Sequence, residues 1–197
     1  IEMTIDLLKK IGVSVTYQKN MITIDQKERI NVIEITVEPD WSSASYFYSI
    51  VSLAERGYSL ELTNFNSFSI QGDKRVSKIF ELFGVKTTFM DDSIRLVKIG
   101  EASQTINLDL SANPDLAQTI AVTCLALKIC CKLTGLHTLK IKETDRITAL
   151  ENEISKFNVF PMVTNDSIEF NACNAIFKAT KILTYEDHRM AMAFACL

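Results

Sequence analysis

The stretch VSKIFELFGVKTTFMDDSIRL, residues 76–96, contains the pattern that decides the fold. Apolar residues recur at helical spacing up to Phe83, Gly84 follows, and two β-rich runs then flank a polar turn. Glycine suits the stop of a helix because the residue after a helix often adopts a positive φ. The stretch therefore predicts an amphipathic helix followed by a β-hairpin.

The same layout occurs twice more along the chain. Residues 4–24 (TIDLLKKIGVSVTYQKNMITI) and 149–170 (ALENEISKFNVFPMVTNDSIEF) each place a helix before a stop residue and a hairpin. The three stop residues, Gly12, Gly84 and Asn158, are spaced by 72 and 74 residues. Such regular spacing indicates a repeated structural unit.

An aspartate also leads into a strongly apolar helical stretch in each repeat. These aspartates are Asp40, Asp109 and Asp187, spaced by 69 and 78 residues. Each unit is thus predicted to be strand, helix, strand, helix, strand, strand (βαβαββ), which places the chain in the α/β class. The first helix of a unit is apolar on all sides, so we expect it to be more buried than the second. Periodicity alone favours a scaffold without catalytic function.

The composition is that of a folded protein and excludes several function classes. Hydrophobic residues make up 47% of the 197 residues, charged residues 23%, and the net charge is −3, so no basic surface for nucleic acid or an anionic membrane is predicted. No apolar run has the length of a membrane span, and no signal peptide is recognised. Because the chain opens in a helical pattern without Met and stops in an apolar run, we expect a piece of a longer protein.

The cysteines indicate a reducing compartment. Of the five, Cys124, Cys130, Cys131 and Cys196 lie in apolar helical patterns, and none forms a C-x-x-C pair. We therefore expect reduced thiols and a cytoplasmic protein.

Polar residues gather where the predicted helices begin, and a helix N-terminus suits an anion because its N–H groups are unpaired and its dipole end is positive. In DWSSASY (residues 40–46), Ser43 and Tyr46 could surround a phosphate, but an ordinary N-cap is favoured. In NPD (residues 113–115) a plain helix start is also favoured. The functional alternative makes Asp115 a carboxylate that orients or deprotonates a substrate hydroxyl.

The stretch IKETDRI, residues 141–147, places cations where a helix begins. Arg146 in the first turn is unfavourable unless an anion meets its guanidinium and the free N–H groups. A salt bridge to Asp145 is an equally good explanation. Glu143, between Lys142 and Arg146, is a candidate general acid or base.

The stretch DHR, residues 187–189, repeats the pattern of an arginine after a capping aspartate. The chain has two histidines, His137 and His188, and neither has the spacing of a metal ligand. We expect no metal site, no nucleotide-binding glycine loop and no Ser-His-Asp set. Several anion sites in one repeat protein indicate a small polyanionic substrate held between units.

Four motifs occur in the order and approximate spacing of the 5-enolpyruvylshikimate-3-phosphate synthase family, which the chain resembles over essentially its whole length. They are EPDWSSASYF (38–47), NPDLAQTIAV (113–122), KETDRI (142–147) and YEDHRMAMAFA (185–195). The resemblance implies transfer of the enolpyruvyl group of phosphoenolpyruvate to the 5-hydroxyl of shikimate 3-phosphate, with release of phosphate and without metal or organic cofactor. It also implies a two-domain inside-out α/β barrel of βαβαββ units, incomplete here, in a full-length protein that is a monomer.

The resemblance assigns acceptor contacts to four residues of this chain. Ser43 and Tyr46 look like contacts of shikimate 3-phosphate, Ser43 to its phosphate. Asp115 looks like the carboxylate that binds the shikimate hydroxyls and takes the 5-hydroxyl proton. Lys142 looks like the lysine beside those hydroxyls. Thr138 stands at the spacing of a substrate-binding asparagine of the family.

Three further residues are assigned to phosphoenolpyruvate. Glu143 looks like the acid that protonates its methylene carbon. Arg146 and Arg189 look like the pair that holds its carboxylate or phosphate. The resemblance further implies that residues 1–86 belong to one lobe and residues 87–197 to the other.

Two other functions compete with this interpretation. The sister transferase that acts on UDP-N-acetylglucosamine has the same fold and donor, although KETDRI and YEDHRMAM together favour the shikimate enzyme. A non-catalytic scaffold of the same repeat would make the charges at Asp115, Glu143, Arg146 and Arg189 dispensable.

We predict that the 197-residue chain alone does not catalyse the transfer. The anion-binding motifs that the family carries before its equivalent of Ile1, and a lysine after its equivalent of Leu197, are not part of this sequence. The measurement is phosphate release by the purified chain supplied with phosphoenolpyruvate and shikimate 3-phosphate. Release above that of a reaction without protein would contradict the prediction.

Overall fold

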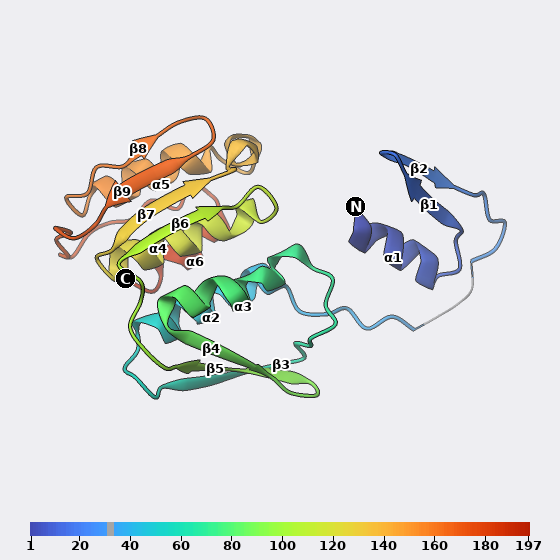
Figure 1. Cartoon of the computed structure of the whole chain (residues 1–197). Helices are drawn as coiled ribbons and strands as arrows, with labels where there is room; N and C mark the ends of the chain where they lie inside the picture. The colour runs from blue at the N-terminus through green and yellow to red at the C-terminus, as the bar shows by residue number, and fades with distance from the viewer. Residues whose placement is uncertain (31–33) are drawn as a thin grey trace.

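The computed structural model of the chain describes residues 1–30 and 34–197. Its first elements are α1 (Glu2–Lys10), β1 (Val15–Gln18) and β2 (Met21–Ile24). They lie to one side of the remaining elements (Figure 1), and β1 and β2 form a two-stranded antiparallel sheet. Ile5, Val13 and Val15 form a small separate core beneath them. This first segment therefore makes a helix-plus-hairpin unit of its own.

Two larger sheets follow. The first has the strand order β3-β5-β4 and is antiparallel throughout. The second has the order β6-β7-β9-β8, in which β6 and β7 are parallel and the other pairs antiparallel. Their strands are β3 (Ser59–Thr63), β4 (Val85–Phe89), β5 (Ser93–Lys98), β6 (Thr105–Asp109), β7 (Cys130–Thr134), β8 (Met162–Val163) and β9 (Ile168–Asn171).

The helices lie between the two larger sheets (Figure 1). They are α2 (Trp41–Leu53), α3 (Val76–Ile79), α4 (Ala117–Ala126), α5 (Arg146–Ser155) and α6 (His188–Phe194). Short 3₁₀ turns extend α3 on both sides and precede two other helices: Gly72–Arg75 (η1), Phe80–Phe83 (η2), Pro114–Leu116 (η3) and His137–Ile141 (η4). Helix α2 packs on β3, β4 and β5, helix α4 packs on β7, and the two helices contact each other. Helices α2 and α4 thus lie between the two sheets, as the resemblance to an inside-out α/β barrel implied.

The repeat predicted from sequence is confirmed at its stop residues. Gly12, Gly84 and Asn158 have φ angles of 83°, 73° and 60°, the left-handed conformation in which glycine and asparagine are favoured. The order β6-α4-β7-α5-β8-β9 is one complete βαβαββ unit. In the unit containing α2, the described residues 34–40 form no strand, and residues 31–33 lie outside the described part of the chain.

A side chain takes the backbone hydrogen bonds just before α2. Pro39 has no N–H to donate to a neighbouring strand. Its carbonyl oxygen accepts a hydrogen bond from Nε2 of Gln71 at 2.8 Å, and Oε1 of Gln71 accepts from the N–H of Trp41 at 2.9 Å. The backbone here bonds to a side chain instead of a sheet.

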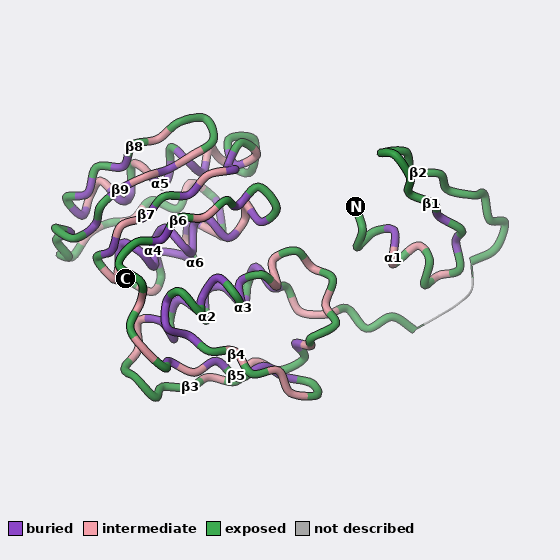
Figure 2. The backbone as a smooth tube through the Cα atoms, viewed as in Figure 1, coloured by how far each residue is buried: buried purple, intermediate pink, exposed green. Residues whose placement is uncertain are grey.

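The first helix of a unit is the more buried one, as expected. Nine of the ten residues of α4 are buried, against six of the ten residues of α5. Figure 2 shows that buried residues follow the inner helices, whereas the turns around the sheets are exposed. Helix α4 therefore forms the centre of the molecule, with neighbours on every side.

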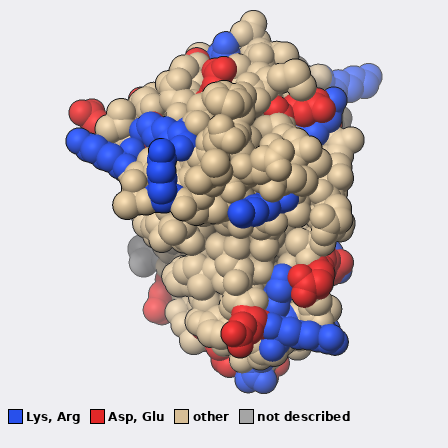
Figure 3. All heavy atoms as spheres, turned by 90° about the vertical axis from the view of Figure 1, so that its left-hand side faces the viewer, with Lys and Arg blue, Asp and Glu red and all other residues tan. Residues whose placement is uncertain are grey.

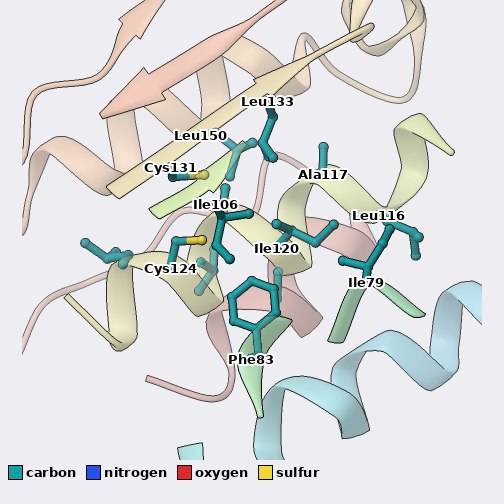
Figure 4. Close-up of a cluster of buried hydrophobic side chains, with 14 of the residues drawn as sticks. Ile79, Phe83, Ile106, Leu116, Ala117, Ile120, Cys124, Cys131, Leu133 and Leu150 are labelled. Atoms are coloured by element: carbon teal, nitrogen blue, oxygen red, sulfur yellow. The ribbon is translucent and has the colours of Figure 1, made fainter. Parts of the chain in front are cut away.

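A continuous core joins the two larger sheets. It runs from Trp41 to Phe194 and includes Phe83, Ile120 and Leu133, all fully buried (Figure 4). Helices α2 and α4 also share two hydroxyl contacts, Ser45 to Thr119 at 2.9 Å and Ser49 to Thr123 at 2.8 Å. Residues 41–196 accordingly pack as one body.

This packing bears on the lobe boundary expected between Lys86 and Thr87. That position falls inside β4, which pairs along its whole length with β5 in a sheet that also contains β3. The two separate cores instead lie on either side of the residues between β2 and α2. We therefore propose that the lobes divide there, before Asp40, because few contacts cross a true domain boundary.

Charges of both signs are interspersed on the surface. On the face shown in Figure 3, Lys and Arg groups lie beside Asp and Glu groups in both the upper and the lower part of the molecule. In the part of the chain that the structure describes, no helix is long and apolar enough to cross a membrane.

We predict that Gly84→Ala destabilises the fold far more than Gly100→Ala. A Cβ at position 84 would lie 2.1 Å from the carbonyl oxygen of Gly100, at a φ of 73°, whereas a Cβ at position 100 meets no atom within 4 Å. The left-handed backbone and the backbone overlap together are expected to cost about 3 kcal/mol. Urea unfolding of the two variants measures the difference, and equal midpoints would contradict the prediction.

Candidate active site

Three helix starts converge on one carboxylate. Asp115 lies in η3 just before α4, and its two oxygens face the starts of α5 and α6. Asp115 Oδ1 lies 3.0 Å from Nη1 of Arg146 and 3.5 Å from Nζ of Lys142, while Oδ2 lies 3.3 Å from Nη2 of Arg189. The side chain of Asp115 is 27% exposed, so solvent or a ligand reaches it. Residues that are far apart in sequence thus form one ionic cluster.

Arg146 is the buried centre of this cluster. Its side chain is 1% exposed and, besides Asp115, it contacts Asp187 through Nε at 2.6 Å and Glu143 through Nη2 at 2.5 Å. Asp145, the partner considered from sequence, instead caps α5 by accepting hydrogen bonds from the N–H and hydroxyl of Thr148. The guanidinium is therefore fully engaged by carboxylates.

Asp187 is the partner that the sequence did not identify. It was recognised as an N-cap, and it does accept a hydrogen bond from the N–H of Arg189, but it is also fully buried against Arg146. Burial raises the pKa of Asp187, yet the hydrogen bonds from Arg146 and the Arg189 N–H outweigh burial and bring the pKa below its ordinary value. Asp187 is thus held ionised beside Arg146.

The cluster is electrically balanced. Its cations are Lys142, Arg146 and Arg189, and its carboxylates are Asp115, Glu143 and Asp187. Glu143 is the most open of the carboxylates, with 48% of its side chain exposed. An anion that binds here must therefore displace a carboxylate from its cation or bring further cations with it.

The start of α2 is an N-cap, as the favoured interpretation held. Asp40 accepts hydrogen bonds from the N–H groups of Ser42 and Ser43, and the Ser43 hydroxyl also donates to Asp40 at 2.9 Å. Burial raises the pKa of Asp40, but these hydrogen bonds lower it below its ordinary value overall. Binding of a phosphate by Ser43 stays a prediction.

Tyr46 links α2 to the ionic cluster. It is 8% exposed, and burial raises the pKa of its hydroxyl above the ordinary value, although the nearby Arg189 guanidinium opposes the rise. The two groups of residues singled out from sequence are therefore neighbours in the fold.

Two buried polar side chains near the cluster have no hydrogen-bond partner among the described residues. Gln118, on α4 one turn after Asp115, is fully buried with both amide atoms unpartnered, and the Thr138 hydroxyl in η4 is unpartnered as well. Gln118 was not identified from sequence, because a single glutamine in an apolar helix carries no pattern.

A cavity of about 900 Å³ between α1 and residues 35–40 and 66–71 includes Asp40 but none of the other candidate residues.

Metal chemistry has no candidate ligands in the described ranges. No group of three or more His, Cys, Asp or Glu side chains in residues 1–30 and 34–197 is arranged to hold a metal ion.

Comparison with known proteins identifies the family. The family model of EPSP synthase (3-phosphoshikimate 1-carboxyvinyltransferase) matches residues 1–197. The chain belongs to the EPSP synthase family. It is 40% identical over 203 residues to 3-phosphoshikimate 1-carboxyvinyltransferase of Bacteroides fragilis strain YCH46, covering 99% of this chain and 48% of that protein. The enzyme of Buchnera aphidicola subsp. Baizongia pistaciae is 35% identical over 204 residues, covering 100% of this chain and 45% of that protein.

Solved structures of EPSP synthase show the same fold. One from Acinetobacter baumannii superposes with a TM-score of 0.75 at 20% identity, covering 98% of this chain and 46% of that chain. A second from the same organism gives a TM-score of 0.72. The expected fold class is thereby confirmed. The chain spans about half the length of the curated EPSP synthases it matches.

We predict that Asp187→Asn destabilises the chain most at neutral pH. Removing one partner of a buried ion pair leaves Arg146 partly uncompensated and is expected to cost about 3 kcal/mol. Because the pKa of Asp187 is lowered on folding, its contribution is present above the unfolded value of about 3.9 and is lost as the pH falls through the folded value.

Chemical unfolding of both proteins between pH 7 and pH 2 tests this, and the two stabilities are expected to converge in acid. Asp6→Asn is the control, since its pair with Lys10 is exposed and contributes about 0.5 kcal/mol or less. A difference in unfolding stability that stays constant at all pH values would contradict the lowered pKa of Asp187.

Proposed function

We propose that this chain carries the acid–base half of an EPSP synthase. The reaction is transfer of the enolpyruvyl group of phosphoenolpyruvate to the 5-hydroxyl of shikimate 3-phosphate, with release of phosphate. The observation that supports it most directly is the convergence of Lys142, Arg146 and Arg189 on Asp115. Such a site pairs a carboxylate that can accept a proton with cations suited to anionic substrates.

In the first step Asp115 accepts the proton of the 5-hydroxyl while the hydroxyl oxygen bonds to the central carbon of phosphoenolpyruvate. Its side chain is 27% exposed, which allows contact with an acceptor, and the three cations around it orient the carboxylate. Lys142, 3.5 Å from Asp115, is close enough to bind the same hydroxyl.

In the same step Glu143 delivers a proton to the methylene carbon of phosphoenolpyruvate. Elimination then completes the transfer: the Glu143 carboxylate takes back one methyl proton, the bond between the central carbon and the phosphate oxygen breaks, and phosphate leaves with the proton held by Asp115. Glu143 is the open member of the cluster and, among the described residues, its carboxylate pairs with Arg146 alone, so it can turn toward a bound substrate.

Arg146 and Arg189 are proposed to hold the carboxylate or phosphate of phosphoenolpyruvate. Arg146 is buried with its donors engaged, whereas Arg189 is 14% exposed and, among the described residues, its guanidinium pairs with one carboxylate, that of Asp115. Arg189 is therefore the more accessible member of the pair. The balanced charge of the cluster supports the proposal that the 197-residue chain alone is inactive, since two anionic substrates need additional cations.

The remaining assignments are proposals of the same kind. Ser43 and Tyr46 are proposed contacts of shikimate 3-phosphate, with Ser43 released from its cap to meet the phosphate. A cytoplasmic location is proposed because all five cysteines are free thiols. The full-length protein is proposed to be a monomer without nucleic-acid or membrane partners.

We predict that Asp115→Asn and Glu143→Gln each lower kcat roughly 10²–10⁴-fold, the range of general acid–base catalysis. The assay uses a chimera in which this chain replaces the matching segment of the Bacteroides fragilis enzyme, and follows phosphate release. Asp91→Asn, an exposed carboxylate in the β4–β5 turn, is the matched control and should leave kcat unchanged.

The same chimera separates the rival functions. Unchanged kcat in both variants of an active chimera would favour the scaffold interpretation. Activity with UDP-N-acetylglucosamine instead of shikimate 3-phosphate would favour the sister transferase. An inactive wild-type chimera that is folded would contradict the proposed function.

A further inference from the structure

Glu153 is a fully buried carboxylate that the proposed reaction does not use. It lies on α5, seven residues after Arg146, which is about two helical turns, so both side chains leave the helix on the same face. Its side chain is 0% exposed. Burial of a carboxylate is costly unless it is paired and hydrogen-bonded, so its partners indicate why it is there.

Those partners tie α5 to the segment that leads into α6. Oε1 of Glu153 accepts a hydrogen bond from the hydroxyl of Tyr185 at 2.9 Å, and Oε2 accepts from the N–H of Leu183 at 3.0 Å. Oε2 also lies 2.5 Å from Nζ of Lys156, which donates to the carbonyl oxygen of Lys181 at 3.0 Å. All the contacts beyond α5 therefore fall in residues 181–185.

This segment has no regular secondary structure to hold its shape. Residues 172–187 are all described and contain neither helix nor strand. Tyr185 and Glu186 both have left-handed φ angles, 56° and 54°, which are unfavourable for residues other than glycine. A backbone of this kind persists when surrounding contacts impose it, and Glu153 supplies such contacts at one end.

The other end of the segment is the ionic cluster. Asp187 follows Glu186 directly and pairs with Arg146, and Arg189 extends from the first turn of α6 to Asp115. The segment is thus fixed to one face of α5 at two points, Glu153 and Arg146. A displacement of the segment at Glu153 is therefore transmitted along the backbone to Asp187, which pairs with Arg146.

We propose that Glu153 is a positioning residue, which through Tyr185 and Leu183 places Asp187 and Arg189 in the active site. Glu153 touches no substrate in this proposal. Its consequence for catalysis rests on the proposed function, because that function assigns Arg189 to phosphoenolpyruvate.

The structural test is amide hydrogen exchange in the 197-residue chain, and it requires no activity. Glu153→Gln keeps the shape of the side chain but removes its charge. It is expected to raise exchange at the amides of Asp187 and Arg189 about tenfold or more, because local opening of the segment becomes easier. Glu151→Gln is the control, since Glu151 is on the same helix and its side chain makes no hydrogen bond or ion pair with the described residues.

The kinetic test uses the chimera described above. Glu153→Gln is expected to raise the KM for phosphoenolpyruvate about tenfold, with the KM for shikimate 3-phosphate unchanged and kcat within about threefold. Tyr185→Phe removes only the hydroxyl. It should also raise amide exchange and the KM for phosphoenolpyruvate, but by less than Glu153→Gln does. If Glu153→Gln fails to fold, Tyr185→Phe by itself tests the positioning function.

The outcomes separate the two proposals. Faster exchange in Glu153→Gln and Tyr185→Phe, but not in Glu151→Gln, supports the positioning function even if the wild-type chimera is inactive, which would overturn only the proposed reaction. Unchanged exchange at Asp187 and Arg189 overturns the positioning function. So does an equal loss of affinity for both substrates in an active chimera, since a general loosening of the fold produces that result.

Discussion

The buried guanidinium of Arg146 is the constraint on which the arrangement of the second half of the chain depends. A cation that is 1% exposed is stable only when carboxylates and good hydrogen-bond geometry compensate its lost hydration. Asp115, Glu143 and Asp187 do so from three different parts of the chain. The starts of α4, α5 and α6 must therefore meet, and the apolar core around α4 holds them there.

The same residues support both the fold and the proposed chemistry, which explains why the cluster has two levels of burial. Arg146 and Asp187 form an inner pair without solvent, whereas Asp115 and Glu143 are 27% and 48% exposed. The inner pair fixes geometry, and the outer carboxylates remain accessible to a substrate. A pre-organised site of this kind reduces the rearrangement that a reaction requires.

The sequence predicted much of the local structure and less of its assembly. Helix stops at Gly12, Gly84 and Asn158 and the caps at Asp40 and Asp187 were correct, because each depends on the preference of one residue for one backbone conformation or hydrogen bond. Residues 34–40, the described part of the segment before α2, form no strand, and the Gln71 side chain bonds to the backbone of Pro39 and Trp41 there. The lobe boundary expected between residues 86 and 87 stays a prediction; it falls inside a strand of the three-stranded sheet, whose pairing over long separations leaves no local signal in the sequence.

By itself the sequence determined the repeat, the α/β class, the family motifs and the polar residues at each helix start. Periodicity, capping and motif spacing are properties of neighbouring residues, so they can be read along the chain. Only the tertiary structure decided that Asp187 rather than Asp145 pairs with Arg146, and that Glu153 binds the segment before α6. Those choices depend on which side chains become buried together, and the cost of an unpaired buried charge then selects the partner.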